Sequence, residues 1–239
     1  MDLILSSGFL GFARHLGVLD AVSERGLAID AVVGTSSGAL VGALWTSGLS
    51  LDEIADELSK NSPLRNLQLS WTPWRGLFSL NRVQGILRRY LPRTFAALPR
   101  PFAVGVCDER RGHCLLTKGP LVEAVVASVA IPRVFARVRV EQAYYCDGGT
   151  VDRLAVNAWR AWRPHRTALL HEIERTLGVS VPYDPTGVVQ LQTPRSGAKL
   201  WDLGDVDAQR REAREIVSRR LDEVAGDPDS ALAKSLTTK

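Results

Sequence analysis

The hydrophobic positions of this chain alternate between short apolar runs and longer stretches with helical spacing. Residues 3–5 and 31–33 are short apolar runs, which predict two buried strands. Between them, residues 12–25 carry apolar side chains every three or four positions, and Gly26 follows, so we predict a helix that ends there. Residues 39–46 are apolar on all sides, which predicts a buried helix directly after the second strand.

The same alternation continues to the end of the chain. Ser50 and Glu53 have the spacing of a capping box, which opens a helix that reaches about residue 60. The patterns predict three further helices at residues 81–90, 121–130 and 205–224. They also predict five further strands at residues 102–107, 114–118, 144–146, 167–170 and 188–192. Strands that alternate with helices indicate an α/β protein with a mostly parallel sheet.

Composition narrows the class of protein. The chain has 239 residues, of which 45% are hydrophobic and 23% charged, values that exclude a disordered or collagen-like protein. The longest uncharged apolar-rich stretch, residues 39–49, is shorter than the roughly 20 residues needed to cross a bilayer. The opening Met-Asp lacks the basic start of a secretory signal. We therefore expect a soluble, cytoplasmic protein that contacts membranes only peripherally.

The cysteines and acidic residues do not form metal-binding patterns. Cys107, Cys114 and Cys146 are an odd number without CxxC spacing, so we expect small buried thiols rather than disulfides or a zinc site. The acidic residues do not follow a calcium-loop pattern. The sequence predicts no metal and no other cofactor.

Charge is distributed unevenly along the chain. The net charge of +4 arises from −5 in residues 1–62, +11 in residues 63–166 and −2 in residues 167–239, and 25 of the 30 basic residues are arginine. An arginine-rich segment suits an anionic partner such as a membrane surface, although a solvated face would have the same composition. We expect no nucleic-acid partner, because no binding motif accompanies the charge.

One irregular stretch combines tryptophan with arginine. Trp71 and Trp74 lie between Arg65 and Arg75 in a segment that proline and glycine interrupt. These side chains prefer the headgroup region of a bilayer, so the stretch is either a lipid-docking segment or a loop packed over the site.

The sharpest local motif is Gly34-Thr35-Ser36-Ser37-Gly38, between an apolar strand and an apolar helix. A GxSxG sequence in this setting predicts a nucleophile elbow, which projects a serine hydroxyl above the edge of the sheet. Only Ser36 has Gly34 and Gly38 at the required offsets, so Ser37 is its neighbour. The alternatives are a simple small-residue turn or a phosphate loop, but the latter requires a lysine after the second glycine.

A serine nucleophile needs a base and an oxyanion site. The common triad order nominates His165 or His171 as the base. Ser36, however, follows only the second strand, which is too early for the usual central elbow. The turn at residues 6–8 can supply backbone N–H groups beside it, and Asp147 ends a strand, where carboxylates of open sheets gather.

Three motifs in a fixed order give the sequence its resemblance to the patatin-like phospholipases. That family has a glycine-rich loop after the first strand, then GxSxG, then a distal DG[AG], which correspond here to residues 6–11, 34–38 and 147–149. Shorter similarities support it at residues 17–19, 76–78, 127–132, 134–135 and 150–152. The resemblance implies a three-layer α/β/α sandwich and a Ser–Asp dyad without a catalytic histidine. In that dyad Ser36 pairs with Asp147, and Gly148 and Gly149 complete the aspartate motif.

The likeness covers roughly residues 2–195. It implies a patatin-like acyl hydrolase domain over residues 1–200, with residues 201–239 as a surface helix and frayed tail of the same domain.

The first loop departs from the family pattern. The family reads GGGx[KR]G, whereas this chain has Ser6-Ser7-Gly8-Phe9-Leu10-Gly11, so two glycines are serines and the basic residue is leucine. Serine also has a backbone N–H, so we expect those of Ser7, Gly8, Phe9 and Leu10 to form the oxyanion hole. Arg14, one helical turn on, is a candidate for the missing positive charge.

These features together predict a serine hydrolase of lipid acyl esters. Ser36 would attack the ester carbonyl and Asp147 would accept its proton. Because a free carboxylate has a pKa of ~3.9 and is a weak base, the dyad requires a short, desolvated contact. The alternatives are a catalytically weak lipid-binding or regulatory protein of the same fold, and a Ser-His-Asp esterase that uses His165 or His171.

Overall fold

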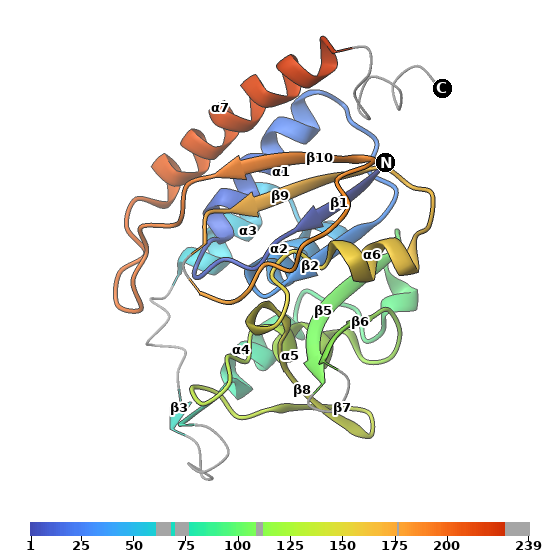
Figure 1. Cartoon of the computed structure of the whole chain (residues 1–239). Helices are drawn as coiled ribbons and strands as arrows, with labels where there is room; N and C mark the ends of the chain where they lie inside the picture. The colour runs from blue at the N-terminus through green and yellow to red at the C-terminus, as the bar shows by residue number, and fades with distance from the viewer. Residues whose placement is uncertain (61–67, 70–76, 109–111, 176, 228–239) are drawn as a thin grey trace.

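An eight-stranded sheet forms the centre of the computed structural model, which describes residues 1–60, 68–69, 77–108, 112–175 and 177–227 (Figure 1). The strand order is β10-β9-β1-β2-β5-β8-β7, and β6 also pairs with β5. The strands are β1 (Asp2–Leu5), β2 (Val32–Thr35), β5 (Phe102–Asp108), β6 (Gly112–Leu116), β7 (Val138–Val140), β8 (Ala143–Asp147), β9 (Ala168–Ile173) and β10 (Val188–Thr193). A separate two-stranded sheet joins β3 (Gln68–Leu69) to β4 (Phe78–Ser79).

Five neighbouring strands of the large sheet are parallel. β10, β9, β1, β2 and β5 run in one direction. β6 and β8 each pair antiparallel with β5, and β7 pairs antiparallel with β8. Leu3, Ile4 and Leu5 of β1 are fully buried, as expected where helices cover both faces of a parallel sheet. The predicted α/β fold with a mostly parallel central sheet is confirmed.

Helices cover the sheet on both faces. They are α1 (Phe12–Glu24), α2 (Ser37–Thr46), α3 (Leu51–Ser59), α4 (Asn81–Leu87), α5 (Leu121–Ser128), α6 (Val156–Trp162) and α7 (Val206–Ala225). Leu3 and Leu5 share one core with side chains of α1, α2, α5 and α7. Ile4, which points to the opposite face, packs in a second core with Trp159 of α6. Alternate residues of one strand thus reach two cores, which gives the three layers.

Most predicted elements occur within a few residues of the expected bounds. The capping box at Ser50 and Glu53 is present, and the two expected strands on either side of residue 110 form an antiparallel pair. α4 ends at Leu87 instead of residue 90, and α6 and β7 were not predicted. None of the helices in the described ranges combines the length and the apolar character needed to cross a membrane.

The last described helix is more than a solvated surface element. Ala213, Val217, Leu221 and Val224 of α7 are buried, and the helix lies along α1 (Figure 1). The tail beyond residue 227 lies outside the described residues.

Two strands that are far apart in sequence meet end to end on one edge of β5. β6 occupies the other edge of β5 from Val104 to Asp108. Gly105 pairs with Thr35 at the end of β2, and the next residue, Val106, pairs with Asp147 at the end of β8. Because β2 is parallel and β8 antiparallel to β5, their carboxyl ends face each other. This register brings the residue after β2 next to Asp147.

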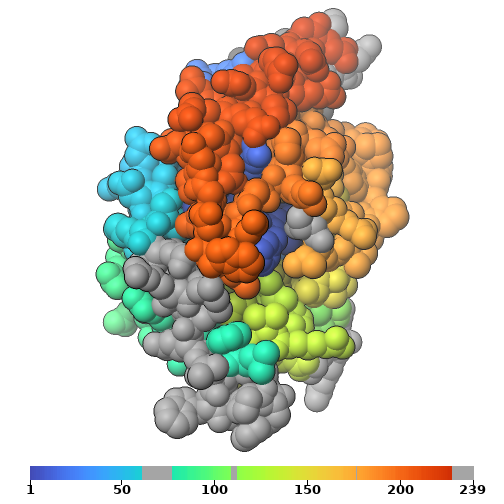
Figure 2. Space-filling model, turned by 90° about the vertical axis from the view of Figure 1, so that its left-hand side faces the viewer, coloured from blue at the N-terminus to red at the C-terminus, as the bar shows by residue number. Residues whose placement is uncertain are grey.

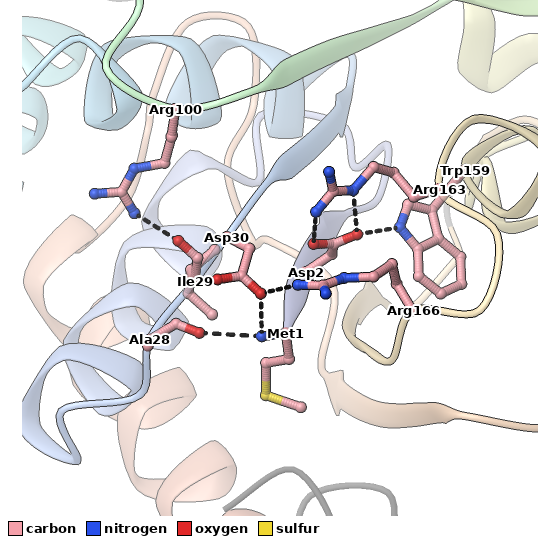
Figure 3. A network of polar contacts seen from close by, with 9 residues as sticks. All are labelled: Met1, Asp2, Ala28, Ile29, Asp30, Arg100, Trp159, Arg163 and Arg166. Atoms are coloured by element: carbon pink, nitrogen blue, oxygen red, sulfur yellow. Dashed lines mark hydrogen bonds and ion pairs between the residues drawn. The ribbon is translucent and has the colours of Figure 1, made fainter. Parts of the chain in front are cut away.

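Many arginines of the basic segment bind within the fold. At the amino-terminal end of β1, Arg163 makes two hydrogen bonds to the buried Asp2 carboxylate, and Arg166 pairs with Asp30 (Figure 3). Arg88 pairs with Glu123 in the same way. Trp71, Trp74, Arg65 and Arg75 lie outside the described residues.

A glycine in α1 allows the close approach of α7. A Cβ atom on Gly17 would lie 2.2 Å from the carbonyl oxygen of Arg210, whereas one on Gly85 of α4 would meet nothing within 4 Å. We therefore expect Gly17→Ala to lower the free energy of unfolding by about 1–3 kcal/mol through overpacking. Gly85→Ala, the matched change in an exposed helix, should raise it by about 0.5–1 kcal/mol. Urea unfolding followed by circular dichroism tests both, and a stabilising Gly17→Ala would contradict the close packing.

Candidate active site

Ser36 lies in a strained turn between β2 and α2. Its backbone has φ 54° and ψ −119°, a conformation that costs a non-glycine residue on the order of 1–3 kcal/mol. The neighbouring glycines allow this turn to pack tightly. A Cβ atom on Gly34 would lie 2.5 Å from the Cα of Ala39, and one on Gly38 would lie 2.3 Å from the carbonyl oxygen of Leu5. The GxSxG motif therefore adopts the geometry of a nucleophile elbow.

A second serine holds the elbow to β5. The Ser36 N–H donates to Ser128 Oγ at 2.8 Å, and the Ser128 hydroxyl donates to the carbonyl oxygen of Gly105 at 2.6 Å. Ser128 is fully buried at the end of α5. Sequence reasoning included Ser128 in the stretch 127–132 that resembles the family but assigned its side chain no role of its own.

Asp147 contacts the serine hydroxyl directly. Ser36 Oγ donates to Asp147 Oδ2 at 2.8 Å, and the Gly149 N–H donates to Asp147 Oδ1 at 2.7 Å. Only 4% of Asp147 is exposed. Burial raises the pKa of Asp147 to about 6, against the smaller lowering effect of these two hydrogen bonds. The contact is short and desolvated, as a carboxylate base requires.

The loop after β1 folds over the end of β9. Gly8 and Gly11 are needed there, because a Cβ atom on either would lie within 2.7 Å of the Ile173 side chain. Within the described part of the chain, the N–H groups of Gly8, Phe9 and Leu10 donate no hydrogen bond to protein. These three N–H groups can therefore donate hydrogen bonds to an anionic ligand.

Ser7 differs from the expectation for this loop. Its N–H donates to the carbonyl oxygen of Arg153 at 2.9 Å, so this N–H is already used. Ser6 also acquires a structural role, since its hydroxyl accepts the N–H of Ile173 at 3.1 Å. The two serines that replace family glycines thus fasten the loop to its surroundings.

Arg153 is a buried cation that sequence reasoning missed. Its guanidinium donates to the carbonyl oxygens of Ser7 and Ile173 and to Ser180 Oγ, and it lies 3.6 Å from Glu172. Only 1% of Arg153 is exposed. Arg14, the expected replacement for the lost basic residue, instead pairs with Glu212 of α7. The cation next to the loop is therefore Arg153.

The late histidines do not approach the Ser36 hydroxyl. His171 is fully buried, and its Nδ1 lies 2.7 Å from His15 Nδ1, so one ring must carry a proton there and the other must not. His171 Nε2 contacts Thr193 Oγ1, and His15 Nε2 lies 3.3 Å from Ser37 Oγ. Burial lowers the pKa of His15 to about 3 and that of His171 well below its usual value.

His165 is exposed at a turn after α6. Among the described residues, the structure thus brings Asp147 to Ser36 and brings neither His165 nor His171 there.

Of the three thiols, which were expected to be buried, Cys146 is buried and Cys107 and Cys114 are half-buried. Cys107, Cys114 and Cys146 are free, and burial raises the pKa of Cys146 to about 12. Among the residues that the structure describes, no three His, Cys, Asp or Glu side chains gather as metal ligands would.

The Ser36–Asp147 pair opens into a cavity of about 250 Å³. Ser7, Gly8, Phe9 and Leu10 form another part of its wall. The remaining lining is mostly apolar, with Ser37, Glu57 and Thr150 as its polar members, and its large apolar side chains are Phe12, Leu40, Leu58, Leu80, Val83, Ile86, Leu87, Val129, Ile131, Phe135, Leu177, Leu200 and Leu203. Figure 2 looks onto the carboxyl ends of the parallel strands, where the blue N-terminal chain lies at the floor of a hollow between orange and orange-red segments.

Comparisons with known proteins identify the family of this chain. A family model described as patatin-like phospholipase matches residues 3–158. An uncharacterized NTE family protein of Mycobacterium tuberculosis is 34% identical over 154 residues, which are 62% of this chain and 42% of that protein. Neuropathy target esterase sws of Drosophila persimilis is 43% identical over 72 residues, which are 29% of this chain and 5% of that protein. The chain thus spans less than half the length of these relatives.

Solved structures share the fold at low sequence identity. VipD from Legionella pneumophila has a TM-score of 0.58 and 12% identity, with 93% of this chain and 66% of that chain covered. ExoU, in its complex with SpcU from the Pseudomonas aeruginosa type III secretion system, has a TM-score of 0.51 and 16% identity, with 93% and 51% covered. At these identities the likeness shows the fold alone.

The buried histidine pair should make the protein sensitive to acid. Unfolded histidines gain protons below a pKa of about 6.5, whereas burial lowers the pKa of His15 to about 3 and that of His171 well below its usual value, so stability should fall as the pH decreases below about 6.5. The loss is at most about 1.4 kcal/mol per pH unit for each ring. In urea unfolding measured between pH 7 and pH 4, the free energy of unfolding should decrease less steeply with falling pH in His15→Gln than in wild type. His165→Gln, at an exposed turn, controls for the substitution, and equal slopes in wild type and His15→Gln would contradict the prediction.

The raised pKa of Asp147 predicts the opposite pH dependence. The folded state favours the protonated carboxyl group, so Asp147 stabilises the fold at pH values below its unfolded pKa of about 4. This stabilisation is lost as the pH rises through about 6. Asp147→Asn removes the buried charge, keeps one acceptor oxygen for the Gly149 N–H and places an NH2 donor where Asp147 accepts from Ser36 Oγ. The variant should therefore gain stability over wild type between pH 4 and pH 8, by at most about 3 kcal/mol. Urea unfolding curves at pH 4 and pH 8 measure this gain. The same difference in free energy of unfolding between variant and wild type at both pH values would refute the prediction.

Proposed function

The chain belongs to the patatin-like phospholipase family, and we propose that it hydrolyses lipid acyl esters with a Ser36–Asp147 dyad. The observation that carries this proposal is the 2.8 Å hydrogen bond from Ser36 Oγ to a buried carboxylate, at a strained elbow that lines an apolar cavity. A shared proton, an exposed nucleophile and a place for an acyl chain are the requirements of acyl transfer.

In the first half-reaction, Ser36 Oγ attacks the ester carbonyl carbon as its proton passes to Asp147 Oδ2. The resulting oxyanion accepts hydrogen bonds from the N–H groups of Gly8, Phe9 and Leu10, and the N-terminus of α2 adds a favourable field. The proton on Asp147 then moves to the departing alcohol oxygen as the carbon–oxygen bond breaks. Acyl-Ser36 remains.

In the second half-reaction, water replaces the alcohol. Asp147 takes a proton from this water as the water oxygen attacks the acyl carbon, and the same loop holds the second oxyanion. The ester bond to Ser36 breaks and Ser36 Oγ recovers the proton from Asp147, which releases the fatty acid. Since Asp147 accepts and returns one proton in each half, no histidine is required.

The apolar lining favours an acyl chain as the buried part of the substrate. Contacts with leucine, valine, isoleucine and phenylalanine side chains can stabilise each methylene by about 0.8 kcal/mol when it leaves water. The headgroup would remain at the mouth of the cavity. An anionic membrane surface beside the arginine-rich segment remains part of the proposal, although many of these arginines bind internal carboxylates and carbonyl groups.

The dyad is tested by hydrolysis of short- and long-chain nitrophenyl esters. Ser36→Ala and Asp147→Asn should each lower kcat/KM by about a thousandfold or more, because one removes the nucleophile and the other the proton acceptor. In wild type, kcat/KM should rise with pH and level off above about 6, where Asp147 is ionised.

Two matched variants control for folding and for local disturbance. Ser37→Ala removes the adjacent hydroxyl, which contacts His15, and Asp152→Asn changes a second buried aspartate that bonds the Leu154 N–H. Both should stay within about tenfold of wild type. A folded Asp147→Asn with full activity, together with an inactive His171→Gln, would favour the triad alternative. A wild type without activity on any ester would favour a lipid-binding protein.

A further inference from the structure

The exposed large hydrophobic side chains of the molecule are concentrated around the cavity. Among the described residues, seven such side chains are exposed: Leu77, Val134, Tyr144, Val151, Leu177, Val179 and Trp201. Single exposed hydrophobic residues are ordinary on a protein surface. Their placement in this fold, however, is not scattered.

Four of them lie on the loops that follow β8, β9 and β10. Leu177 lines the cavity, and Val151, Val179 and Trp201 are each next in sequence to a lining residue. The two loops after β8 and β9 also touch, because the Val179 N–H donates to the carbonyl oxygen of Gly149. In Figure 2 the orange and orange-red segments of these loops border the hollow.

Two more exposed hydrophobic residues, Val134 and Leu77, belong to the segments that precede Phe135 and Phe78. Val134 precedes the lining residue Phe135, and Leu77 precedes Phe78, whose N–H donates to the carbonyl oxygen of Val134 at 2.9 Å. Six of the seven exposed hydrophobic side chains therefore line the cavity, neighbour a lining residue in sequence or, like Leu77, belong to the segment that is hydrogen-bonded to Val134. We call these six residues the mouth cluster.

Tyr144 is the exception. It lies within β8, opposite Arg139 of β7, and neither it nor an adjacent residue lines the cavity. Its exposed fraction of 51% is close to the 50% of Val179 and below the 67% of Trp201. The chain thus provides an exposed aromatic residue of comparable size away from the mouth.

We propose that the mouth cluster inserts into the surface of a lipid aggregate, so that an acyl chain enters the cavity without crossing water. This inference rests on the proposed function and adds the surface through which the substrate arrives. The occupant is a lipid surface because the cluster is continuous with an apolar cavity that ends at the Ser36–Asp147 pair. A lipid that left its bilayer to reach this cavity would expose its acyl chain to water, at about 0.8 kcal/mol per methylene.

The composition of the mouth suits a lipid interface. Trp201, the most exposed member, lies beside Lys199, whose ammonium is 6.0 Å from the ring. Tryptophan prefers the interfacial region and lysine extends to the headgroups. Charges of both signs lie near the cluster in sequence, with Arg133, Arg175 and Lys199 basic and Glu174 and Asp202 acidic, so we expect apolar insertion to contribute more than net charge to binding.

The test is partitioning of the full chain onto sucrose-loaded phosphatidylcholine vesicles, measured by sedimentation. Ser36→Ala is the background for all binding measurements, so that the lipid is not consumed. In this background, the pair Val179→Ser and Trp201→Ser should weaken partitioning at least tenfold, while Tyr144→Ser should change it less than twofold. Neither Val179 nor Trp201 lines the cavity, so hydrolysis of nitrophenyl butyrate by the same variants with Ser36 restored should match wild type.

The outcomes separate the mouth cluster from the dyad. Partitioning that survives about 0.5 M salt and falls only in the mouth variant supports the proposal, because apolar contacts are not screened. Vesicle binding that is absent, unchanged in the mouth variant, or equally reduced by Tyr144→Ser overturns it, even if esters are hydrolysed. Mouth-dependent binding without hydrolysis of any ester would instead leave the cluster in place and refute the hydrolase.

Discussion

The candidate site depends on the shared edge of β5, where β2 and β8 meet end to end. Thr35 and Asp147 pair with the consecutive residues Gly105 and Val106, and no side-chain adjustment could bring Ser36 to Asp147 without this register. The arrangement leaves no room for a side chain at the junction. A Cβ atom on Gly148 would lie 2.7 Å from the Gly105 backbone. Backbone pairing therefore fixes the serine–carboxylate distance, and Ser128 ties the elbow to the same strand.

A second constraint holds the loop after β1 against this junction. The family pattern uses glycines there, and this chain uses two serines together with Arg153. Ser7 donates to the Arg153 carbonyl oxygen and accepts from the Arg153 guanidinium, so the loop and the segment after the aspartate motif are bound at two points. Because Arg153 is buried, this attachment is not screened by salt or replaced by water. The free N–H groups of the loop are thereby kept beside the elbow.

Burial has opposite consequences for the two kinds of titratable group in this region. It raises the pKa of Asp147 to about 6 and lowers that of His15 to about 3, because it penalises whichever form is charged. The carboxylate becomes a stronger base while remaining ionised near neutral pH. The histidine pair remains neutral and structural, which links α1 and β9 near Ser37. Burial thus separates Asp147, the proposed proton acceptor, from His171, one of the two histidines that the triad order nominated.

The sequence by itself determined what depends on local pattern. Most of the strands and helices, the elbow at Ser36, the aspartate at a strand end and the family were predicted, since turns, caps and periodicity involve residues that are close in the chain, whereas α6 and β7 were not. The tertiary structure decided what depends on strand register and on the direction of each side chain. It placed Asp147 against Ser36, used the Ser7 N–H, buried Arg153 and paired His15 with His171. These contacts join residues more than a hundred positions apart, and neither spacing nor composition specifies which distant partner a side chain meets.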